Sequence, residues 1–233
     1  MENPEYRLAV QICGATADKL QRHVCQYFTE VVVEQARAEQ FDEVEKAHNL
    51  IKRLNRSCPA LLHNVVPQLE EELRVEETQL RIMATQVLGE MFADKGGADF
   101  VRKYPTTWNA WLMRKNDKAS AVRLAFVEAI RGVLSNLTDQ QETIEAAIQH
   151  KLFDPEEKVR AAVCKLYSQL DYETALHHVS PDMLRAVAGR GLDKKVRRFS
   201  TYEHTRLSLY KHTVRVEALN AVGRLFSLAY PEM

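Results

Sequence analysis

The sequence predicts an all-α protein built from repeated pairs of antiparallel helices, and three observations support this fold class. Glycine and proline are scarce, with 8 Gly and 7 Pro in 233 residues, which is typical of a helical chain. One apolar pattern of helical period occurs four times. The first three copies begin at Leu80, Val122 and Val159, so their spacings are 42 and 37 residues, close to the HEAT and armadillo repeat length.

Each copy of the pattern opens with an aliphatic residue followed by arginine. Counting that aliphatic residue as zero, apolar side chains stand at positions 0, 4, 7, 8 and 11. These positions form one stripe of an α-helix, whereas a strand would need alternation by two. A helix pair cannot bury such a stripe alone, but stacked neighbours can. The sequence therefore predicts a HEAT-repeat (armadillo-like) α-solenoid, with the copies as the second helices of their pairs.

A first helix is expected before each copy of the pattern. Suitable segments are residues 61–73, 108–114, 141–152 and 181–188. Pro105, Pro155 and Pro181 suit the first turns of such helices, where the missing N–H of proline costs little.

The predicted organisation is one continuous array over residues 1–233. It comprises irregular helical repeats over 1–56, regular repeats over 57–195, an insertion at 196–211 and a final second helix over 212–233. The irregular part is expected to hold helices over 5–13, 15–39 and 42–55, with Asp42 as an acidic N-cap.

An aspartate precedes two copies of the pattern by five residues, Asp117 before Val122 and Asp154 before Val159. This Asp-x4-Val-Arg motif is common where the first helix of a HEAT repeat turns into the second. The acid can cap the second helix, and the arginine can pair with an acid of a neighbouring repeat. The predicted structural residues of these turns are Asp117, Arg123, Asp154, Arg160, Asp193 and Arg215.

The last copy begins at Val214, 55 residues after Val159. Removal of the 16 residues 196–211 reduces this spacing to 39 and places Asp193 five residues before Val214. We therefore expect an insertion in the turn of a repeat. Its net charge of +3 and its interleaved aromatic residues leave three interpretations open: a nucleic-acid or phosphate contact, a solvated surface loop, or a retained intron or gene-model error.

Several functional classes lack support in the sequence. There is no apolar run long enough for a membrane span and no secretory leader. The four cysteines show no CxxC pair, and the formal net charge is zero, which argues against a surface built throughout for nucleic acid. No zinc-site spacing, glycine-rich phosphate loop or serine nucleophile motif is present. Neither catalysis nor a cofactor or metal is expected.

Trp108 and Trp111 lie three residues apart on one predicted helix face. They are either core residues or the edge of a peptide groove. Together with nearby cations they form the predicted partner-binding set: Trp108, Trp111, Arg114, Lys115, Lys118, Lys194 and Lys195. The acidic run of residues 70–72 is interpreted as a solvated helix end.

Five ordered segments resemble one known family. They are DKLQRHVCQYFTEVVVEQ, CPALLHNVVPQLEEELRVEETQLRIMATQVLGEMFADKGG, RKNDKASAVRLAFVEA, HKLFDPEEKVRAAV, and RGLDKK together with VRVEALNAVGRLF. The family is the precocious-dissociation-of-sisters group of sister chromatid cohesion regulators, and the resemblance is closest to fungal members. It covers nearly the whole chain apart from residues 196–211, where the family runs straight through the turn.

The resemblance implies a nuclear, chromosomal scaffold that binds the kleisin subunit of cohesin. It also implies work with the wing-apart-like releasing factor and the cohesin acetylation machinery, an indirect association with chromatin, and no membrane. Family members are longer, so the chain is interpreted as a fragment. Two alternatives stay open: a HEAT module that binds DNA directly through a basic loop, and a generic HEAT adaptor.

Overall fold

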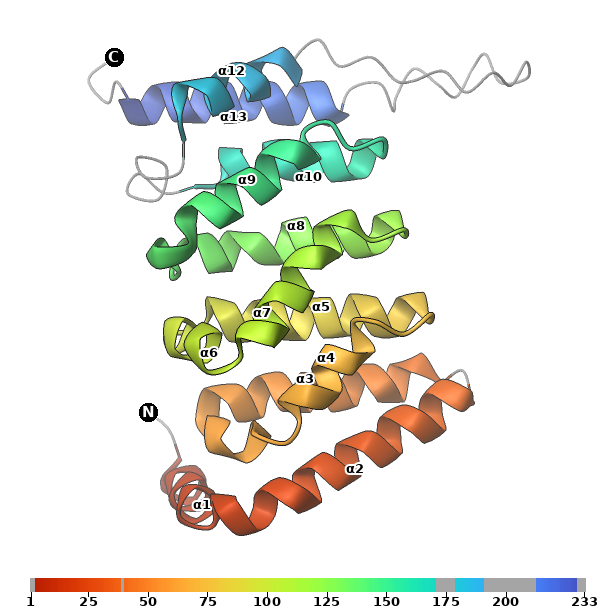
Figure 1. Ribbon diagram of the computed structural model, residues 1–233. Helices are drawn as coiled ribbons and strands as arrows, with labels where there is room; N and C mark the ends of the chain where they lie inside the picture. The colour runs from red at the N-terminus through yellow and green to blue at the C-terminus, as the bar shows by residue number, and fades with distance from the viewer. Residues whose placement is uncertain (1–2, 39, 171–178, 191–212, 230–233) are drawn as a thin grey trace. The chain divides into compact units, whose positions relative to one another are not determined.

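The computed structural model describes residues 3–38, 40–170, 179–190 and 213–229 of the chain. All regular secondary structure in these residues is α-helix or 3-10 helix, and none of the described residues forms a strand. The chain divides into two compact units, Met1–Arg114 and Lys115–Met233. Figure 1 labels the helices of both units. The predicted all-α class is therefore confirmed.

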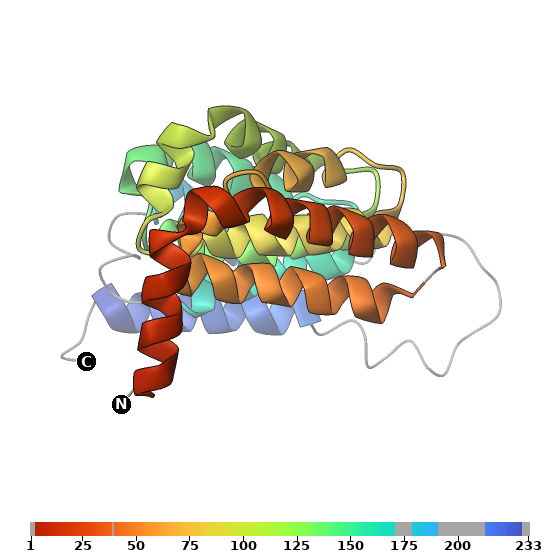
Figure 2. The same cartoon turned by 90° about the horizontal axis from the view of Figure 1, so that it is seen from below.

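The first unit contains seven α-helices and one short 3-10 turn within its described residues. They are α1 (Pro4–Ala15), α2 (Ala17–Arg37), α3 (Phe41–Ser57), η1 (Pro59–Leu62), α4 (Val66–Glu72), α5 (Thr78–Ala93), α6 (Gly97–Lys103) and α7 (Pro105–Leu112). α3 packs between α2 and α5, and α4 and α7 pack on each other and on α5. α1 crosses the end of α2 at a steep angle (Figure 2).

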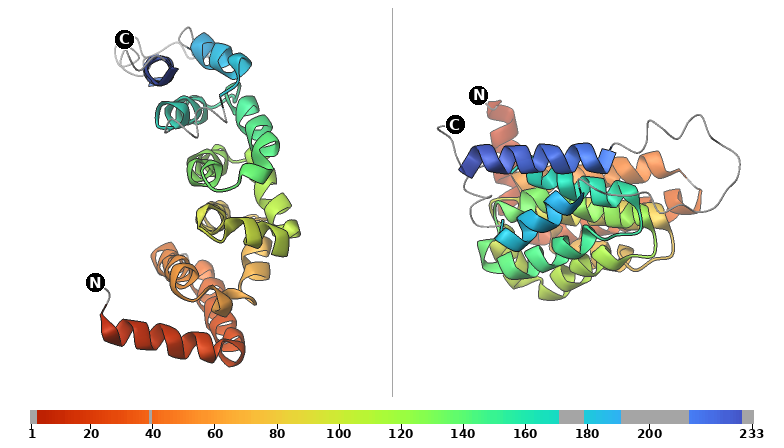
Figure 3. Two further views of the ribbon diagram at one scale, coloured as in Figure 1. Left: turned by 90° about the vertical axis from the view of Figure 1, so that its left-hand side faces the viewer. Right: turned by 90° about the horizontal axis from the view of Figure 1, so that it is seen from above.

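The second unit repeats the paired arrangement. Its helices are α8 (Ser120–Leu134), η3 (Thr138–Gln140), α9 (Gln141–Lys151), α10 (Glu157–Ser168), α12 (Pro181–Gly189) and α13 (Thr213–Ala229). α10 packs between α8 and α13, α9 packs on α8 and α10, and α12 packs on α13. Seen along the helix axes, α8, α10 and α13 form one layer, with α9 and α12 in the other (Figure 3).

The predicted apolar stripes form the core of each unit. In α8, the side chains of Val122, Phe126, Ile130 and Val133 are fully buried. The remaining stripe residue of α8, Ala129, is half-buried. The corresponding stripe residues of the other three copies are buried, except Val222 of α13, which is half-buried. The helical period of the sequence therefore identified the faces that stack.

Two local expectations about helix starts were wrong. Pro105 and Pro181 are the first residues of α7 and α12, but Pro155 precedes Glu156, the N-cap residue of α10. Asp42 is not an N-cap, because α3 starts one residue earlier, at Phe41. Its carboxylate instead lies in the first turn, where its negative charge interacts favourably with the positive end of the helix dipole.

Gly97 begins α6 directly against the C-terminal end of α5. A Cβ at Gly97 would overlap the carbonyl oxygen of Phe92 and lie 2.9 Å from its carbonyl carbon. Gly97→Ala is therefore expected to lower the free energy of unfolding by about 1–3 kcal/mol, because a backbone atom must move. Gly96→Ala is the matched control, since a Cβ there meets nothing within 4 Å. Urea unfolding compares the two, and equal midpoints would contradict the prediction.

The prediction of one continuous array over residues 1–233 stays a prediction. The predicted insertion at 196–211 lies outside the described residues, as does residue 212 at the start of the predicted final helix. No helix among the described residues is long and apolar enough to cross a membrane.

Candidate functional site

In the first three stripes, the arginine that follows the first aliphatic residue holds the turn before its helix. Arg81, Arg123 and Arg160 each donate from Nη1 to the two main-chain carbonyls six and five residues earlier. The N–O distances run from 2.7 to 3.3 Å. The same arginine contact thus occurs in three turns. It satisfies carbonyl groups that the helix itself cannot bond.

The aspartates of the motif close the turn and do not cap the helix. Asp117 Oδ1 accepts from the amide of Ala119 at 2.9 Å, and Asp154 Oδ1 accepts from the amide of Glu156 at 3.0 Å. Ala119 and Glu156 are themselves the N-cap residues of α8 and α10. The expected capping role is therefore corrected, since an Asp two residues before the cap reaches the cap amide and not the first helical turn.

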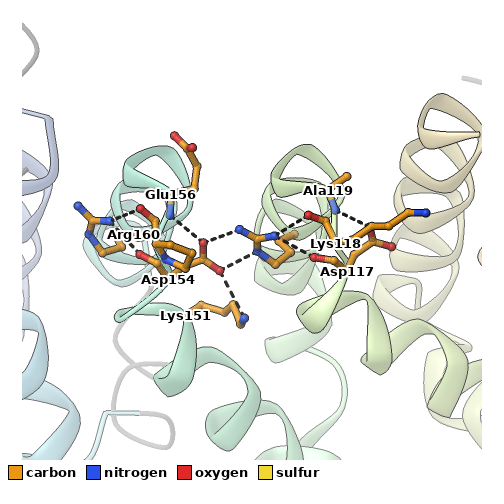
Figure 4. Close-up of polar contacts among 9 residues, drawn as sticks. Asp117, Lys118, Ala119, Lys151, Asp154, Glu156 and Arg160 are labelled. Carbon is orange, nitrogen blue, oxygen red and sulfur yellow. Dashed lines mark hydrogen bonds and ion pairs between the residues drawn. The ribbon is translucent and has the colours of Figure 1, made fainter. Parts of the chain in front are cut away.

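Arg123 also joins two successive turns of the second unit. Its Nε lies 2.8 Å from Asp154 Oδ2, and its Nη2 lies 2.8 Å from Asp154 Oδ1, a bidentate pair. Lys151 Nζ lies 3.4 Å from Asp154 Oδ2 (Figure 4). The side chains of Arg123 and Asp154 are 12% and 1% exposed, so solvent screens the pair little.

This environment shifts the pKa of both partners. Burial by itself would raise the pKa of Asp154, but the hydrogen bonds from Arg123 and the Glu156 amide outweigh it, helped by the charges of Arg123 and Lys151, and the pKa is lowered. The pKa of Arg123 is raised, chiefly by its hydrogen bonds to Asp154. Both shifts favour the charged pair in the folded protein.

The lowered pKa of Asp154 predicts a pH-dependent stability. Asp154→Asn is expected to lower the free energy of unfolding by about 1.5–3 kcal/mol at pH 7, because a hydrogen-bonded charge is lost. The carboxylate stabilises the fold above its unfolded pKa, near 3.8, and this contribution is lost as the pH falls through the lower folded pKa. Urea unfolding at pH 7, 5, 4 and 3 should show a constant gap between wild type and variant down to about pH 4 and a gap that narrows progressively below it.

The matched control for Asp154→Asn is Asp182→Asn. Asp182 pairs with Arg185 on α12, but both side chains are more than 70% exposed. Its loss is expected to cost less than about 1 kcal/mol. A gap for Asp154→Asn of the same size at pH 3 as at pH 7 would show that its effect does not come from the ionised carboxylate.

The two tryptophans belong to the core of the first unit. Trp108 and Trp111 are 4% and 0% exposed, and Phe92 contacts both rings at centroid distances of 4.9 and 5.3 Å. Trp111 Nε1 donates to the carbonyl of Thr85 at 2.9 Å. The expectation that these rings edge a groove for a partner is therefore corrected, because their burial leaves almost no ring surface open.

The predicted cations differ in their exposure and in their contacts. Arg114 Nη1 donates to the carbonyl of Leu73 at 2.6 Å, which ties the end of α7 to the end of α4. Lys118 is exposed, Lys115 is half-buried, and Arg215 is half-buried on α13. The remaining predicted site residues, Asp193, Lys194 and Lys195, lie outside the described residues.

A buried histidine–glutamate pair was not predicted. His48 of α3 and Glu72 of α4 are 1% and 3% exposed, and His48 Nε2 lies 2.8 Å from Glu72 Oε2. His48 Nδ1 lies 2.8 Å from the carbonyl of Val44. The interpretation of residues 70–72 as a solvated end was wrong for Glu72. No sequence signal marked the pair, because 24 residues separate its members.

An exposed aromatic contact was also missed. Phe153, next to Asp154, is 63% exposed, and the guanidinium of Arg190 lies 4.7 Å from its ring centroid. The signal available in the sequence was an aromatic residue at a turn position. Within the described ranges, no group of three or more His, Cys, Asp or Glu side chains could hold a metal ion.

Comparison with known proteins identifies the family. The family model described as "Sister chromatid cohesion protein PDS5 protein" matches residues 1–233. The chain is 32% identical to "Sister chromatid cohesion protein pds5" of Schizosaccharomyces pombe, over 99% of this chain and 18% of the relative. It is 27% identical to "Sister chromatid cohesion protein PDS5 homolog A" of Homo sapiens, over 84% of this chain and 14% of the relative. The chain thus spans less than a fifth of these relatives.

A solved structure shares the fold. A chain in "Structure of the Pds5-Scc1 complex and implications for cohesin function" matches 100% of this chain with a TM-score of 0.80 and 18% identity, and 34% of that chain is covered. At this identity the likeness establishes the HEAT-repeat fold, and the family model and the fission yeast relative establish the kinship. The chain therefore belongs to the PDS5 family of sister chromatid cohesion proteins.

Proposed function

We propose that the chain is part of a non-catalytic scaffold that regulates cohesin on chromatin by binding the kleisin subunit. The observation that carries this proposal is the match of the family model to all 233 residues. The structure of the Pds5-Scc1 complex supports kleisin as the partner, because the whole chain shares the fold of a chain in that structure. Stacked helix pairs supply an extended surface for such a partner.

The finer parts of the proposal concern the other partners. The wing-apart-like releasing factor and the cohesin acetylation machinery would act on the complete protein, in the nucleus and on chromosomes, to maintain and release sister chromatid cohesion. Association with chromatin would then be indirect, through cohesin. The repeated turns, with Arg123 and Asp154, serve in this proposal to hold successive repeats in register.

Binding of the purified chain to a kleisin segment tests the proposal. Fluorescence anisotropy with a labelled N-terminal kleisin segment is expected to show saturable binding, and an unrelated acidic peptide of equal length is the control. A generic HEAT adaptor would show no preference for kleisin. Duplex DNA tests the remaining alternative: salt-sensitive binding that is lost on deletion of residues 196–211, without kleisin binding, would favour a direct DNA binder.

A further inference from the structure

The contact between His48 of α3 and Glu72 of α4 places two ionisable side chains in the core of the first unit. The side chains are 2% and 3% exposed, and His48 Nε2 lies 2.8 Å from Glu72 Oε2. A charge without a partner is strongly unfavourable at such a depth. The hydrogen bonds of the pair, and not the solvent, therefore decide how many protons it holds.

These hydrogen bonds allow one arrangement of protons. The carbonyl oxygen of Val44, 2.8 Å from His48 Nδ1, can only accept, so Nδ1 carries a proton. At 2.8 Å, two lone pairs on Nε2 and Glu72 Oε2 would repel each other, so one further proton lies between them. Gln68 Nε2 donates to the other oxygen, Glu72 Oε1, at 3.4 Å. The folded pair thus shares one proton and has no net charge.

The helices packed on α3 surround the pair mainly with apolar groups. From α2, the ring of Phe28 meets the His48 ring edge-on, with the centroids 5.2 Å apart, and the buried residues of η1 are leucines. Arg81 is the buried titratable residue of α5, and its Nη1 donates to the carbonyls of residues 75 and 76. The contacts of this guanidinium group thus include main-chain oxygens of the turn before α5.

The other charged side chains of α3 and α4 near the pair face solvent or one another. Glu45, three residues before His48, is exposed. The ion pairs of this region are Lys52 with Glu90, and both Glu70 and Glu71 with Arg74. Glu72 is therefore the carboxylate that shares the proton of His48.

We infer that His48 and Glu72 form a proton-dependent latch between α3 and α4, which stabilises the first unit less and less as the pH rises above neutrality. Free glutamate is ionised above about pH 5 and free histidine is neutral above about pH 7, so the unfolded chain then holds no proton at these two residues. The folded pair still holds one. Folding therefore takes up a proton, and each rise in pH favours the unfolded state. This inference does not depend on the proposed function.

Glu72→Gln tests the latch, because a glutamine amide donates to a neutral His48 and needs no shared proton. The folded wild type then holds one proton more than the folded variant, whereas the two unfolded chains hold equal numbers above about pH 5. The ratio of unfolding equilibrium constants, wild type over variant, is therefore expected to rise about tenfold per pH unit between pH 5.5 and 8. Contributions of the other ionisable groups cancel in this ratio.

Urea unfolding followed by tryptophan fluorescence measures the ratio. The two tryptophans of the chain, Trp108 and Trp111, both belong to the first unit, so their emission reports that unit. His23→Gln is the matched control, because His23 of α2 is exposed and titrates alike in both states. Its ratio to wild type is expected to change less than twofold over the same pH range. A ratio for Glu72→Gln that stays equally constant would overturn the inference.

Nuclear magnetic resonance of the histidine ring nitrogens gives a second readout on the folded wild type alone. The ring shifts of His48 are expected to stay constant from pH 5.5 to 8, because the shared proton does not leave, while those of His23 change around pH 6.5. Titration of His48 together with His23 would overturn the inference, even if Glu72→Gln failed to fold.

Discussion

Replacing Glu72 by alanine is expected to lower the free energy of unfolding of the first unit by about 3–5 kcal/mol, since it removes one member of a buried ionisable pair. His48 and Glu72 are 1% and 3% exposed, so water cannot replace the lost partner. Urea unfolding followed by circular dichroism measures the loss as a lower midpoint at an unchanged slope.

The hydrogen bonds of His48 explain the size of this effect. Val44 offers only a carbonyl oxygen to Nδ1, so Nδ1 must carry a proton and donate. The 2.8 Å contact between Nε2 and Glu72 Oε2 then requires one further proton, which the pair shares. Without Glu72, Nε2 is left with no partner in a dry core.

Glu72→Gln is the matched variant for this prediction. A glutamine side chain can donate an N–H to Nε2 of a neutral His48, so one hydrogen bond is kept. Its cost is expected to be clearly smaller than that of Glu72→Ala. Similar losses for the two variants would show that the carboxylate is needed as a charge, and a negligible loss for Glu72→Ala would contradict the buried pair itself.

Replacing Trp111 by alanine is expected to lower the free energy of unfolding by about 3–5 kcal/mol, the usual cost of removing a large aromatic side chain from a core. Trp111 is 0% exposed, and it packs on Phe92 and Trp108 at centroid distances of 5.3 and 5.4 Å. The ring therefore joins α7 to α5, and its removal leaves a cavity between them. Chemical unfolding of the purified chain measures the loss.

Two controls separate the contributions of Trp111. Trp111→Phe keeps an aromatic ring but loses the 2.9 Å hydrogen bond from Nε1 to the Thr85 carbonyl, so it is expected to cost less than Trp111→Ala. Met113→Ala, at a side chain that is 55% exposed just after α7, should stay within about 0.5 kcal/mol of wild type. Stability losses for Trp111→Ala as small as those of Met113→Ala would place the ring outside the core.

Much of the fold could be predicted from the sequence because it depends on interactions between residues close together in the chain. The period of the apolar stripe in α8, from Val122 to Val133, states which face of the helix must be covered. The Asp-x4-Val-Arg motif marks a turn because both its side chains reach main-chain groups within six residues. Such contacts depend on sequence separation alone, so a single chain displays them.

Contacts between helices distant in sequence were decided by the tertiary structure. The sequence shows four isolated features in His48, Glu72, Phe153 and Arg190, and nothing in it states that they form two pairs. The same holds for Trp111, whose two possible roles differ only in what covers the ring. Helical periodicity determines which face of each helix is buried, but the stacking of the pairs decides which side chains meet there, because that choice depends on the relative positions of whole helices.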